Sequence, residues 1–397
     1  CPGLKGEKAL TFGEFEEEKQ KEADYYFNTY ENPDSEKKDT VKDLSFVKPY
    51  FEFSGACAGC GETSYIRLLT QLVGKKLVIA NATGCSSIYG GSIPSTPYSI
   101  PWANSLFEDN AEFALGMLLS YKQKRNQIES IMKSSLIAID KELKEKFALW
   151  LNNKENFEIT YKLKKELERF QIPKDLRDLL DYIPARSVWA LGGDGWAYDI
   201  GFGGIDHVLS SNEKVKILVL DTEVYSNTGG QMSKSSKVGQ VAEFADFGKK
   251  NAKKDLFKIA MCYPNCYVGS ICLGADFAHT IKTLKEAEAH NGPSIVIAYS
   301  PCVEHGIKGG LSCTNKEQAL AVEVGYQLLM RYHPEENKLY LDSKEPNFDA
   351  YESFLDNENR YQALKIKDEN LAKELLEMNK QNAIKRYQEY KEKSMNK

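Results

Sequence analysis

The stretches VWALGGDGWAYDIGFGG (residues 188–204) and VKILVLDTEVYSNTGGQ (residues 215–231) decide the fold class of this chain. Each begins with a short apolar run, at residues 188–191 and 215–220, and such runs predict buried strands. The first run ends at Asp194, which lies between glycines, and the second ends just before Thr222. About one helix and one strand separate these two residues, so the sequence predicts two neighbouring parallel strands.

Asp194 and Thr222 are therefore expected at the carboxyl edge of a sheet, where open α/β folds bind their ligands. Their oxygens, together with the backbone carbonyl of Val224, suit a magnesium ion that carries phosphates. The glycines beside Asp194 and the amides of the following helix could face those phosphates. Two alternatives stay open at this point. Gly-Asp-Gly could be a plain turn, and a dinucleotide fingerprint would need a further glycine that GDGWAY lacks.

The rest of the chain repeats the same alternation of strand and helix. Further strands are expected at residues 77–81, 267–273 and 294–299, with helices at 62–73, 104–117, 278–290 and 370–393. This pattern predicts an α/β fold with a doubly wound, mostly parallel sheet. Residues 118–183, which are dense in Lys and Glu with spaced apolar residues, are expected to form two or three amphipathic helices. A loop at residues 228–254 carries a basic patch of Lys234, Lys237, Lys249, Lys250, Lys253 and Lys254. We predict that this patch is a solvated face, and the alternative is a docking surface for acidic electron carriers.

Composition excludes several classes of protein. The 397 residues carry 52 Lys and Arg against 57 Asp and Glu, and a formal net charge of -5 argues against a nucleic-acid surface. No apolar run is long enough to span a bilayer and no signal peptide is expected, so we predict a cytoplasmic protein without a membrane partner. Nine cysteines in a reducing compartment favour metal binding or catalysis over a disulfide framework.

Four cysteines are expected near the edge that carries Asp194. Cys57 and Cys60 lie in tight turns before a predicted helix, whereas Cys85 and Cys302 each follow a predicted strand. Their spacing fits a four-iron cluster better than zinc, although a structural zinc site stays open. Cys262, Cys266 or Cys313 could replace Cys302 as the fourth ligand. Glu62 is interpreted as an acid at a helix N-terminus or as a cofactor contact.

These motifs together resemble one family. GDGWAYDIGFGG and DTEVYSNTGGQ, preceded by CAGCGET and NATGCSS and followed by SPCVEHGIKGG, are similar to the C-terminal thiamine-diphosphate-binding part of pyruvate:ferredoxin (flavodoxin) oxidoreductase. The similarity runs over about residues 51–360. Thiamine-diphosphate enzymes in general commonly have Asn where this chain has Thr222, and the oxidoreductase family uses Thr.

The resemblance implies roles for individual residues. Asp194, Thr222 and the Val224 carbonyl would bind magnesium, and Cys57, Cys60, Cys85 and Cys302 would hold a [4Fe-4S] cluster. Asn227 would lie near the keto group of the substrate. Further contacts with thiamine diphosphate would come from Glu62, Cys85, Gly193, Asp194, Gly195, Trp196, Thr222, Glu223, Val224, Tyr225, Ser226 and Asn227.

The resemblance also implies an activity and a domain organisation. The enzyme would oxidatively decarboxylate pyruvate with coenzyme A to acetyl-CoA and CO2, and electrons would pass through iron-sulfur clusters to ferredoxin or flavodoxin. Residues 50–335 would form the thiamine-diphosphate and iron-sulfur domain, with 118–183 as a helical insertion and 336–397 as a C-terminal extension. Residues 1–49, which start with the Cys1-Pro2 pair typical of ferredoxin modules, would be the end of a ferredoxin-like domain and a linker.

The family's N-terminal domains would complete the substrate pocket, and the complete polypeptide is expected to be a homodimer. The fragment alone is expected to be inactive. Two alternatives remain: an oxidoreductase for another 2-oxo acid, and a non-catalytic metal or electron-transfer module.

Overall fold

The computed structural model describes residues 13–29, 40–92, 96–137 and 139–395, so the Cys1-Pro2 pair lies outside the described residues. An eight-stranded sheet forms its centre, in the order β2-β1-β3-β4-β6-β5-β7-β8. Strands β1 to β6 are parallel, and β7 and β8 are added as an antiparallel hairpin. The strands are β1 Leu77–Ala82, β2 Trp102–Ser105, β3 Ser187–Gly193, β4 Lys216–Asp221, β5 Tyr267–Ile271, β6 Ser294–Tyr299, β7 Met330–His333 and β8 Lys338–Leu341. The predicted fold class is confirmed.

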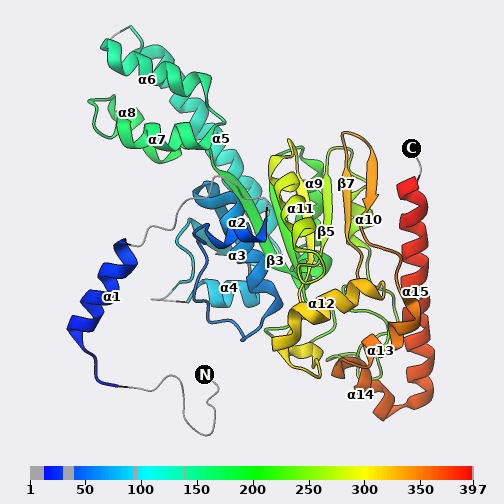
Figure 1. The fold of residues 1–397 in the computed structure, drawn as a ribbon. Helices are drawn as coiled ribbons and strands as arrows, with labels where there is room; N and C mark the ends of the chain where they lie inside the picture. The colour runs from blue at the N-terminus through cyan, green and yellow to red at the C-terminus, as the bar shows by residue number, and fades with distance from the viewer. Residues whose placement is uncertain (1–12, 30–39, 93–95, 138, 396–397) are drawn as a thin grey trace.

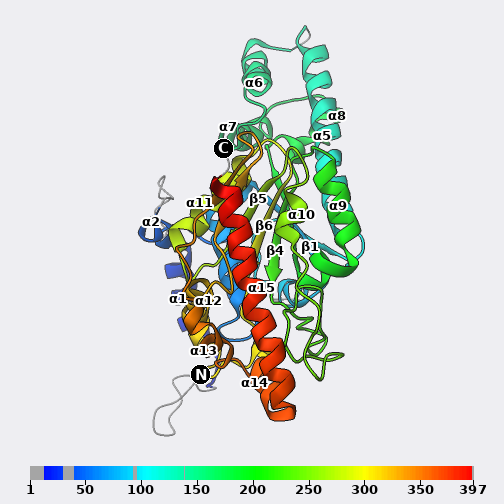
Figure 2. The ribbon, with the colours of Figure 1, turned by 90° about the vertical axis from the view of Figure 1, so that its right-hand side faces the viewer.

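Helices cover both faces of this sheet (Figures 1 and 2). They are α1 Glu17–Thr29, α2 Val41–Ser45, α3 Gly61–Val73, α4 Cys85–Gly90, α5 Asn110–Ser135, α6 Lys141–Asn152, α7 Phe157–Leu167, α8 Lys174–Arg177, α9 Phe202–Ser210, α10 Leu256–Ala260, α11 Phe277–Ala289, α12 Thr314–Glu323, α13 Tyr351–Leu355, α14 Asn359–Lys367 and α15 Glu369–Met395. One core packs α5, α9, α10 and α15 on the sheet, and the other packs α2, α3 and α11. None of the helices in the described ranges is both long and apolar enough to cross a membrane.

The central strands are apolar at every position because both faces of the sheet are buried. Successive side chains of a strand point to opposite faces, so Leu77 and Ile79 of β1 enter one core while Val78 and Ala80 enter the other. Both faces are covered by helices, and the six residues of β1 are all buried. A parallel sheet of this kind requires continuous apolar strands.

Residues 118–183 are largely helical and contain the later part of α5 together with α6, α7 and α8. The first turns of α5 pack on the sheet through Ala111 and Leu115, whereas its later residues Ile128 and Met132 join a separate core with α6, α7 and α8. Figure 1 shows this second group of helices projecting from the end of the sheet. The insertion thus has its own core and is connected through one shared helix.

Two parts of the predicted element pattern are wrong. Residues 102–105 form strand β2, which pairs with β1, and the following helix begins only at Asn110 and extends to Ser135. The segment after α12 contains the β7–β8 hairpin, where we predicted no strand. The two strands of this hairpin have only four residues each and carry the charged residues Arg331 in β7 and Lys338 in β8, so neither shows the apolar run that identified the central strands.

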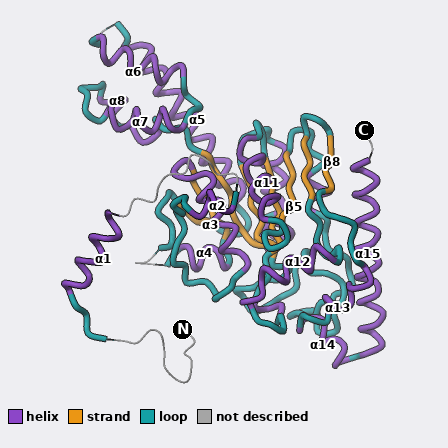
Figure 3. Tube along the Cα trace, in the orientation of Figure 1, coloured by secondary structure: helices purple, strands orange, loops and turns teal. Residues whose placement is uncertain are grey.

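The carboxyl ends of the parallel strands meet at one edge of the sheet. α4 follows β1 and α12 follows β6 at this edge, and Figure 3 shows the long loops that gather between them. Because these loops carry the predicted cysteines and oxygen ligands, we expect the functional site at this edge of the sheet.

Candidate functional site

Asp194 and Thr222 lie side by side at the carboxyl edge, as predicted. β3 and β4 are parallel neighbours with Gly193 opposite Leu220, so the residues that follow the two strands emerge together. Both side chains are buried, with 1% and 3% of their surface exposed. The backbone continues from Asp194 into a π-helical turn at Gly195–Ile200, a feature often found at functional sites.

Three oxygen atoms converge at this point. The Thr222 hydroxyl oxygen lies 2.9 Å from Asp194 Oδ1 and 3.0 Å from the carbonyl oxygen of Val224. Burial raises the pKa of Asp194 to about 8, and the nearby charge of Asp221 adds to this effect. A buried carboxyl group beside two neutral oxygens is a donor set that suits a hard cation, so these residues fit magnesium.

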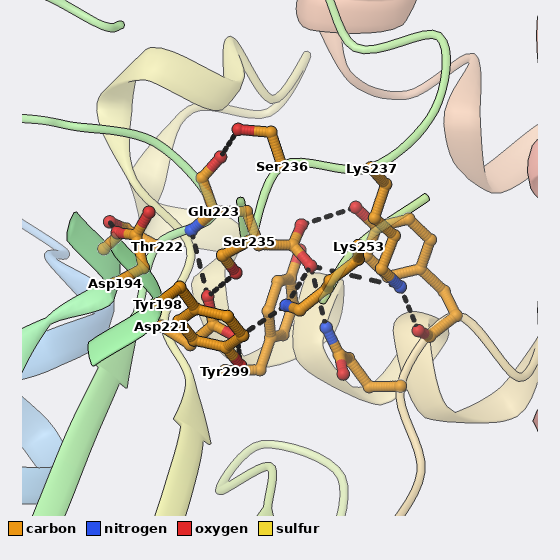
Figure 4. Close-up of polar contacts among 12 residues, drawn as sticks. Asp194, Tyr198, Asp221, Thr222, Glu223, Ser235, Ser236, Lys237, Lys253 and Tyr299 are labelled. Atoms are coloured by element: carbon orange, nitrogen blue, oxygen red, sulfur yellow. Dashed lines mark hydrogen bonds and ion pairs between the residues drawn. The ribbon is translucent and has the colours of Figure 1, made fainter. Parts of the chain in front are cut away.

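Glu223, between the two oxygen-bearing residues, directs its side chain away from them (Figure 4). It has a left-handed backbone with φ of 59°, which is unusual for a residue other than glycine. Its carboxylate lies 2.9 Å from Lys253 Nζ and 3.1 Å from Arg360 Nη1. Burial would raise the pKa of Glu223, but Lys253, Lys237 and Arg360 outweigh it and hold that pKa well below its usual range. We therefore assign the side chain of Glu223 to an ionic network behind the turn, whereas the sequence suggested a cofactor contact.

The prediction that the lysines of residues 228–254 form a solvated face is wrong for three of the six lysines. Lys237 and Lys249 are buried, and Lys253 is held between Asp221 and Glu223 (Figure 4). Lys249 Nζ donates to the carbonyl oxygens of Ser233 and Ser236, at 2.9 and 2.6 Å. These lysines turn inward because buried acids and carbonyl groups surround them. They hold the loop after β4 against the sheet and do not form a docking surface.

All four predicted cysteines line one cavity of about 240 Å³. Cys57 and Cys60 come from the turns before α3, Cys85 begins α4, and Cys302 follows β6. Other residues of the cavity wall are Glu62, Tyr89, Thr222, Ser226 and Asn227. The cavity therefore joins the thiols to the segment that carries the converging oxygens.

Three of the thiol groups in this cavity, those of Cys60, Cys85 and Cys302, ionise less readily than a free cysteine. Burial, reinforced by Glu62, raises the pKa of Cys60 to about 12, and burial also raises the pKa of Cys85 and Cys302. A positively charged centre would be needed to make them thiolates. Within the described ranges no group of three or more His, Cys, Asp or Glu side chains has the geometry to hold a single metal ion. Four thiols spread around a cavity fit a multi-iron cluster, in which each iron takes one thiolate.

Glu62 faces the same cavity and is 4% exposed. Burial raises its pKa to about 7, while a hydrogen bond donated by Tyr89 at 2.8 Å partly opposes that rise. Near neutral pH this carboxyl group can therefore hold or release a proton within the cavity.

The remaining predicted contact residues lie around Asp194. A Cβ atom on Gly195 would come within 2.3 Å of the Tyr225 ring, whereas one on Gly193 would have its nearest neighbour 3.9 Å away. The Trp196 side chain is fully buried in the core, so only its backbone is available to a ligand. Tyr225 covers Gly195 and reaches Asp199 through its hydroxyl group at 3.2 Å.

The sequence did not identify two residues that support the site. His305 is buried, and its Nε2 lies 2.7 Å from the carbonyl oxygen of Thr222. The hydroxyl group of Tyr65 bonds Tyr299, Leu273 and Gln318, and so ties α3 to the end of β6. His305 follows Cys302 by three residues within the motif SPCVEHGIKGG, which was the one available signal for its position.

Comparisons with known proteins find similarity over the segment that contains Asp194 and Thr222. Residues 179–298 match the family model described as thiamine pyrophosphate enzyme, C-terminal TPP binding domain. The chain is 47% identical over 376 residues to pyruvate-flavodoxin oxidoreductase of Klebsiella pneumoniae, covering 89% of this chain and 32% of the relative. It is 43% identical over 378 residues to pyruvate:ferredoxin oxidoreductase of Moorella thermoacetica, with coverage of 89% and 32%.

Among solved structures, 2-oxoglutarate:ferredoxin oxidoreductase from Magnetococcus marinus aligns with a TM-score of 0.42 and 17% identity, covering 64% of this chain and 67% of that chain. The chain spans about a third of the length of the curated relatives it matches.

Proposed function

The chain belongs to the C-terminal, thiamine-diphosphate-binding part of the pyruvate-flavodoxin and pyruvate:ferredoxin oxidoreductases, and on that premise we propose that it carries their catalytic centre. The complete enzyme would oxidatively decarboxylate pyruvate with coenzyme A to acetyl-CoA and CO2. One observation carries the proposal: Thr222 touches Asp194 through its hydroxyl group and also lines the cavity of the four cysteines. A cofactor held at Thr222 would therefore lie beside a cluster held by the thiols.

In this proposal the oxygens of Asp194, Thr222 and Val224 bind magnesium, which in turn binds the diphosphate. The amides of Gly195 and Trp196, at the start of the π-helical turn, would hold the phosphate oxygens. Bound thiamine diphosphate supplies the electron sink that decarboxylation of a 2-oxo acid requires. The convergence of the three oxygens supports this assignment.

Cys57, Cys60, Cys85 and Cys302 would hold a [4Fe-4S] cluster that accepts the electrons singly. Their shared cavity supports the assignment, and it favours Cys302 over Cys313, which lies outside the wall of that cavity. The short path from cofactor to cluster suits electron transfer. More distant clusters would then pass the electrons to ferredoxin or flavodoxin.

Two side chains of the cavity would act on the reactants. Asn227 is exposed at the cavity wall and would orient the keto oxygen of pyruvate through its amide group. Glu62 would contact the cofactor and hold a proton beside it, which its pKa of about 7 supports. Because the relatives are about three times longer, N-terminal domains of the same polypeptide would complete the pocket and bind coenzyme A.

The expected domain boundaries, the homodimer and the cytoplasmic location stay part of this proposal. The boundary at residue 335 crosses a structural unit, since β8 in the C-terminal extension is an edge strand of the main sheet. The extension therefore folds together with the proposed cofactor domain.

An assay of the complete protein tests the function. Under anaerobic conditions we expect pyruvate and coenzyme A to reduce ferredoxin or flavodoxin, with acetyl-CoA formed in proportion. A much higher kcat/KM with 2-oxoglutarate would establish the alternative substrate. A protein that binds zinc and shows no affinity for thiamine diphosphate would be the non-catalytic metal module.

A further inference from the structure

We propose that a closed ring of buried charged and polar groups positions the magnesium-binding turn, and that Arg360 and His305 are its positioning residues. The inference rests on the proposed function, because it concerns the oxygens assigned to magnesium. The members of the ring, in order of contact, are Asp221, Lys253, Glu223, Arg360, Glu358, His305 and Thr222. The ring starts at Asp221 and returns to Thr222, so both of its ends lie in the segment of residues 221–223.

The first part of the ring lies directly behind the turn. Lys253 Nζ is 2.5 Å from Asp221 Oδ2 and 2.9 Å from Glu223 Oε1, so one ammonium group joins the last residue of β4 to the turn (Figure 4). The backbone carbonyl oxygen of Glu223 accepts hydrogen bonds from Ser236 at 2.6 Å and from Gln240 at 3.1 Å. Both ends of Glu223 are thus held, which explains how its left-handed backbone is maintained.

The second part comes from the C-terminal region, more than a hundred residues away in sequence. Arg360, in the first turn of α14, lies 3.1 Å from Glu223 Oε2 through Nη1 and 2.7 Å from Glu358 Oε2 through Nε. Arg360 is 4% exposed, and both carboxylates are fully buried. A guanidinium group that bridges two buried acids satisfies charges that would otherwise repel one another.

His305 closes the ring. Its Nε2 lies 2.7 Å from the carbonyl oxygen of Thr222. Its Nδ1 lies 3.5 Å from Glu358 Oε1 without a hydrogen bond, and the two form an ion pair when the imidazole carries both protons. A carbonyl oxygen can only accept a hydrogen bond, so Nε2 is the donor. Thr222 is therefore held by its carbonyl oxygen on one side, while its hydroxyl group points at Asp194 and Val224 on the other.

This arrangement makes the orientation of the magnesium ligands depend on the ring. The left-handed conformation of Glu223 is what directs the Thr222 hydroxyl and the Val224 carbonyl oxygen to the same point. Loss of Arg360 would leave two buried carboxylates without their shared cation. The turn would then relax, and the Thr222 hydroxyl oxygen and the Val224 carbonyl oxygen would move apart. This would happen although Arg360 itself is not a proposed contact of the cofactor.

A pair of matched arginine variants tests the proposal in the complete protein that carries this chain. Arg331 also bridges two carboxylates, those of Glu286 and Asp342, at 2.9 Å each and is 5% exposed, but it lies on β7 at the far side of the sheet. We expect Arg360→Met to raise the Kd for thiamine diphosphate with magnesium by at least about tenfold. Arg331→Met should lower the Tm less, because the carboxylates of Glu286 and Asp342 are each 25% exposed, and should change that Kd less than about twofold.

The outcomes separate the two proposals. Equal changes of Kd in the two folded variants, or an unchanged Kd in Arg360→Met, would overturn the ring as a positioning device. Absence of thiamine diphosphate binding in the wild-type protein would instead overturn the proposed function.

Variants of His305 keep the test decisive if Arg360→Met does not fold. The amide nitrogen of a glutamine reaches about where Nε2 of histidine lies, so His305→Gln can still donate to the Thr222 carbonyl. We expect His305→Leu to raise the Kd about tenfold and His305→Gln to restore most of the affinity at an equal Tm. Equal affinities of the two variants would show that the imidazole has a packing role only.

Discussion

The hydroxyl oxygen of Thr222 lies 2.9 Å from the carboxylate of Asp194, although the two residues are 28 positions apart in the chain. The two residues follow neighbouring parallel strands, and this contact is the structural basis of the proposed magnesium site. The Val224 carbonyl oxygen also lies 3.0 Å from the Thr222 hydroxyl oxygen. Substitutions can therefore test the contribution of each side chain to the site separately.

Asp194→Asn should remove magnesium-dependent binding of thiamine diphosphate. The substitution keeps the shape of the side chain but removes the one anionic ligand, so we expect a rise in Kd of at least about a hundredfold by calorimetry. Asp206→Asn is the control, because Asp206 is exposed on α9 and contacts Tyr263. An unchanged affinity in Asp194→Asn would refute the metal assignment.

Alanine substitutions at glycines 193 and 195 should differ in their effect on stability, although both should weaken cofactor binding. Gly195→Ala places a Cβ atom 2.3 Å from the Tyr225 ring, so we expect a loss of about 2 kcal/mol in the free energy of unfolding together with weaker cofactor binding. Gly193→Ala meets no protein atom closer than 3.9 Å, so it should weaken cofactor binding at nearly unchanged stability. Urea denaturation and calorimetry check both expectations, and full affinity in Gly193→Ala would place the diphosphate elsewhere.

Cysteine variants should identify the cluster ligands. After anaerobic reconstitution we expect about four irons and four sulfides per cluster in the chain, and a loss of visible absorbance in Cys57→Ala, Cys60→Ala, Cys85→Ala and Cys302→Ala. Cys262→Ala is the control, because Cys262 is exposed on the segment after α10 and lies outside the cavity wall. Retention of iron by all four variants would contradict a shared cluster.

Much of this edge could be predicted from sequence because each ligand follows a recognisable strand. Asp194, Thr222, Cys85 and Cys302 were found from the apolar runs that precede them, since parallel strands bring their carboxyl ends together. The ionic ring could not be found in this way. Arg360 and Glu358 come from a C-terminal segment without a strand signal, and only the folded chain shows that they meet Glu223.

The lysine-rich loop illustrates the same limit. A run of lysines in sequence is typical of a solvated surface, and nothing in residues 228–254 indicates which acids lie beneath it. Lys253 turns inward because Asp221 and Glu223 lie at the adjacent strand end. Charge patterns predict exposure only where no buried partner competes with water.

Tyr65→Phe should destabilise the fold without removing any proposed ligand. The hydroxyl group of Tyr65 donates to the Tyr299 carbonyl at 2.9 Å and accepts from the Leu273 amide and from Gln318, each at 3.0 Å. Its loss leaves the buried Leu273 amide unpaired, while Gln318 still donates to the Tyr299 carbonyl oxygen, so we expect a decrease of about 2 kcal/mol in the free energy of unfolding. In Tyr340→Phe, where the hydroxyl contacts exposed Glu336, the change should stay below about 0.5 kcal/mol. If urea denaturation gives equal decreases in the free energy of unfolding for the two variants, the hydroxyl group of Tyr65 does not have the proposed stabilising role.

Lys216 should give the stability a measurable pH dependence. Burial lowers the pKa of its ammonium group to about 8, although the group donates to the carbonyl oxygens of His290 and Gly292. An unfolded lysine keeps a pKa near 10.4, so between about pH 8 and 10.4 the unfolded state binds more protons. Stability contributed at this position therefore rises with pH across that window. The free energy of unfolding of the wild type minus that of Lys216→Met should increase from pH 8 to 10, and a constant difference would contradict the lowered pKa.

The most direct measurement is a single turnover of the complete protein, followed through the visible absorbance of its iron-sulfur centres under anaerobic conditions. If the cofactor lies beside the cluster held by the four cysteines, pyruvate should bleach this absorbance rapidly in the presence of thiamine diphosphate and magnesium, before any ferredoxin or flavodoxin is added. Asp194→Asn should retain its iron and lose the bleaching. A protein that contains both cofactor and cluster but shows no pyruvate-dependent bleaching would contradict the proposed catalytic centre.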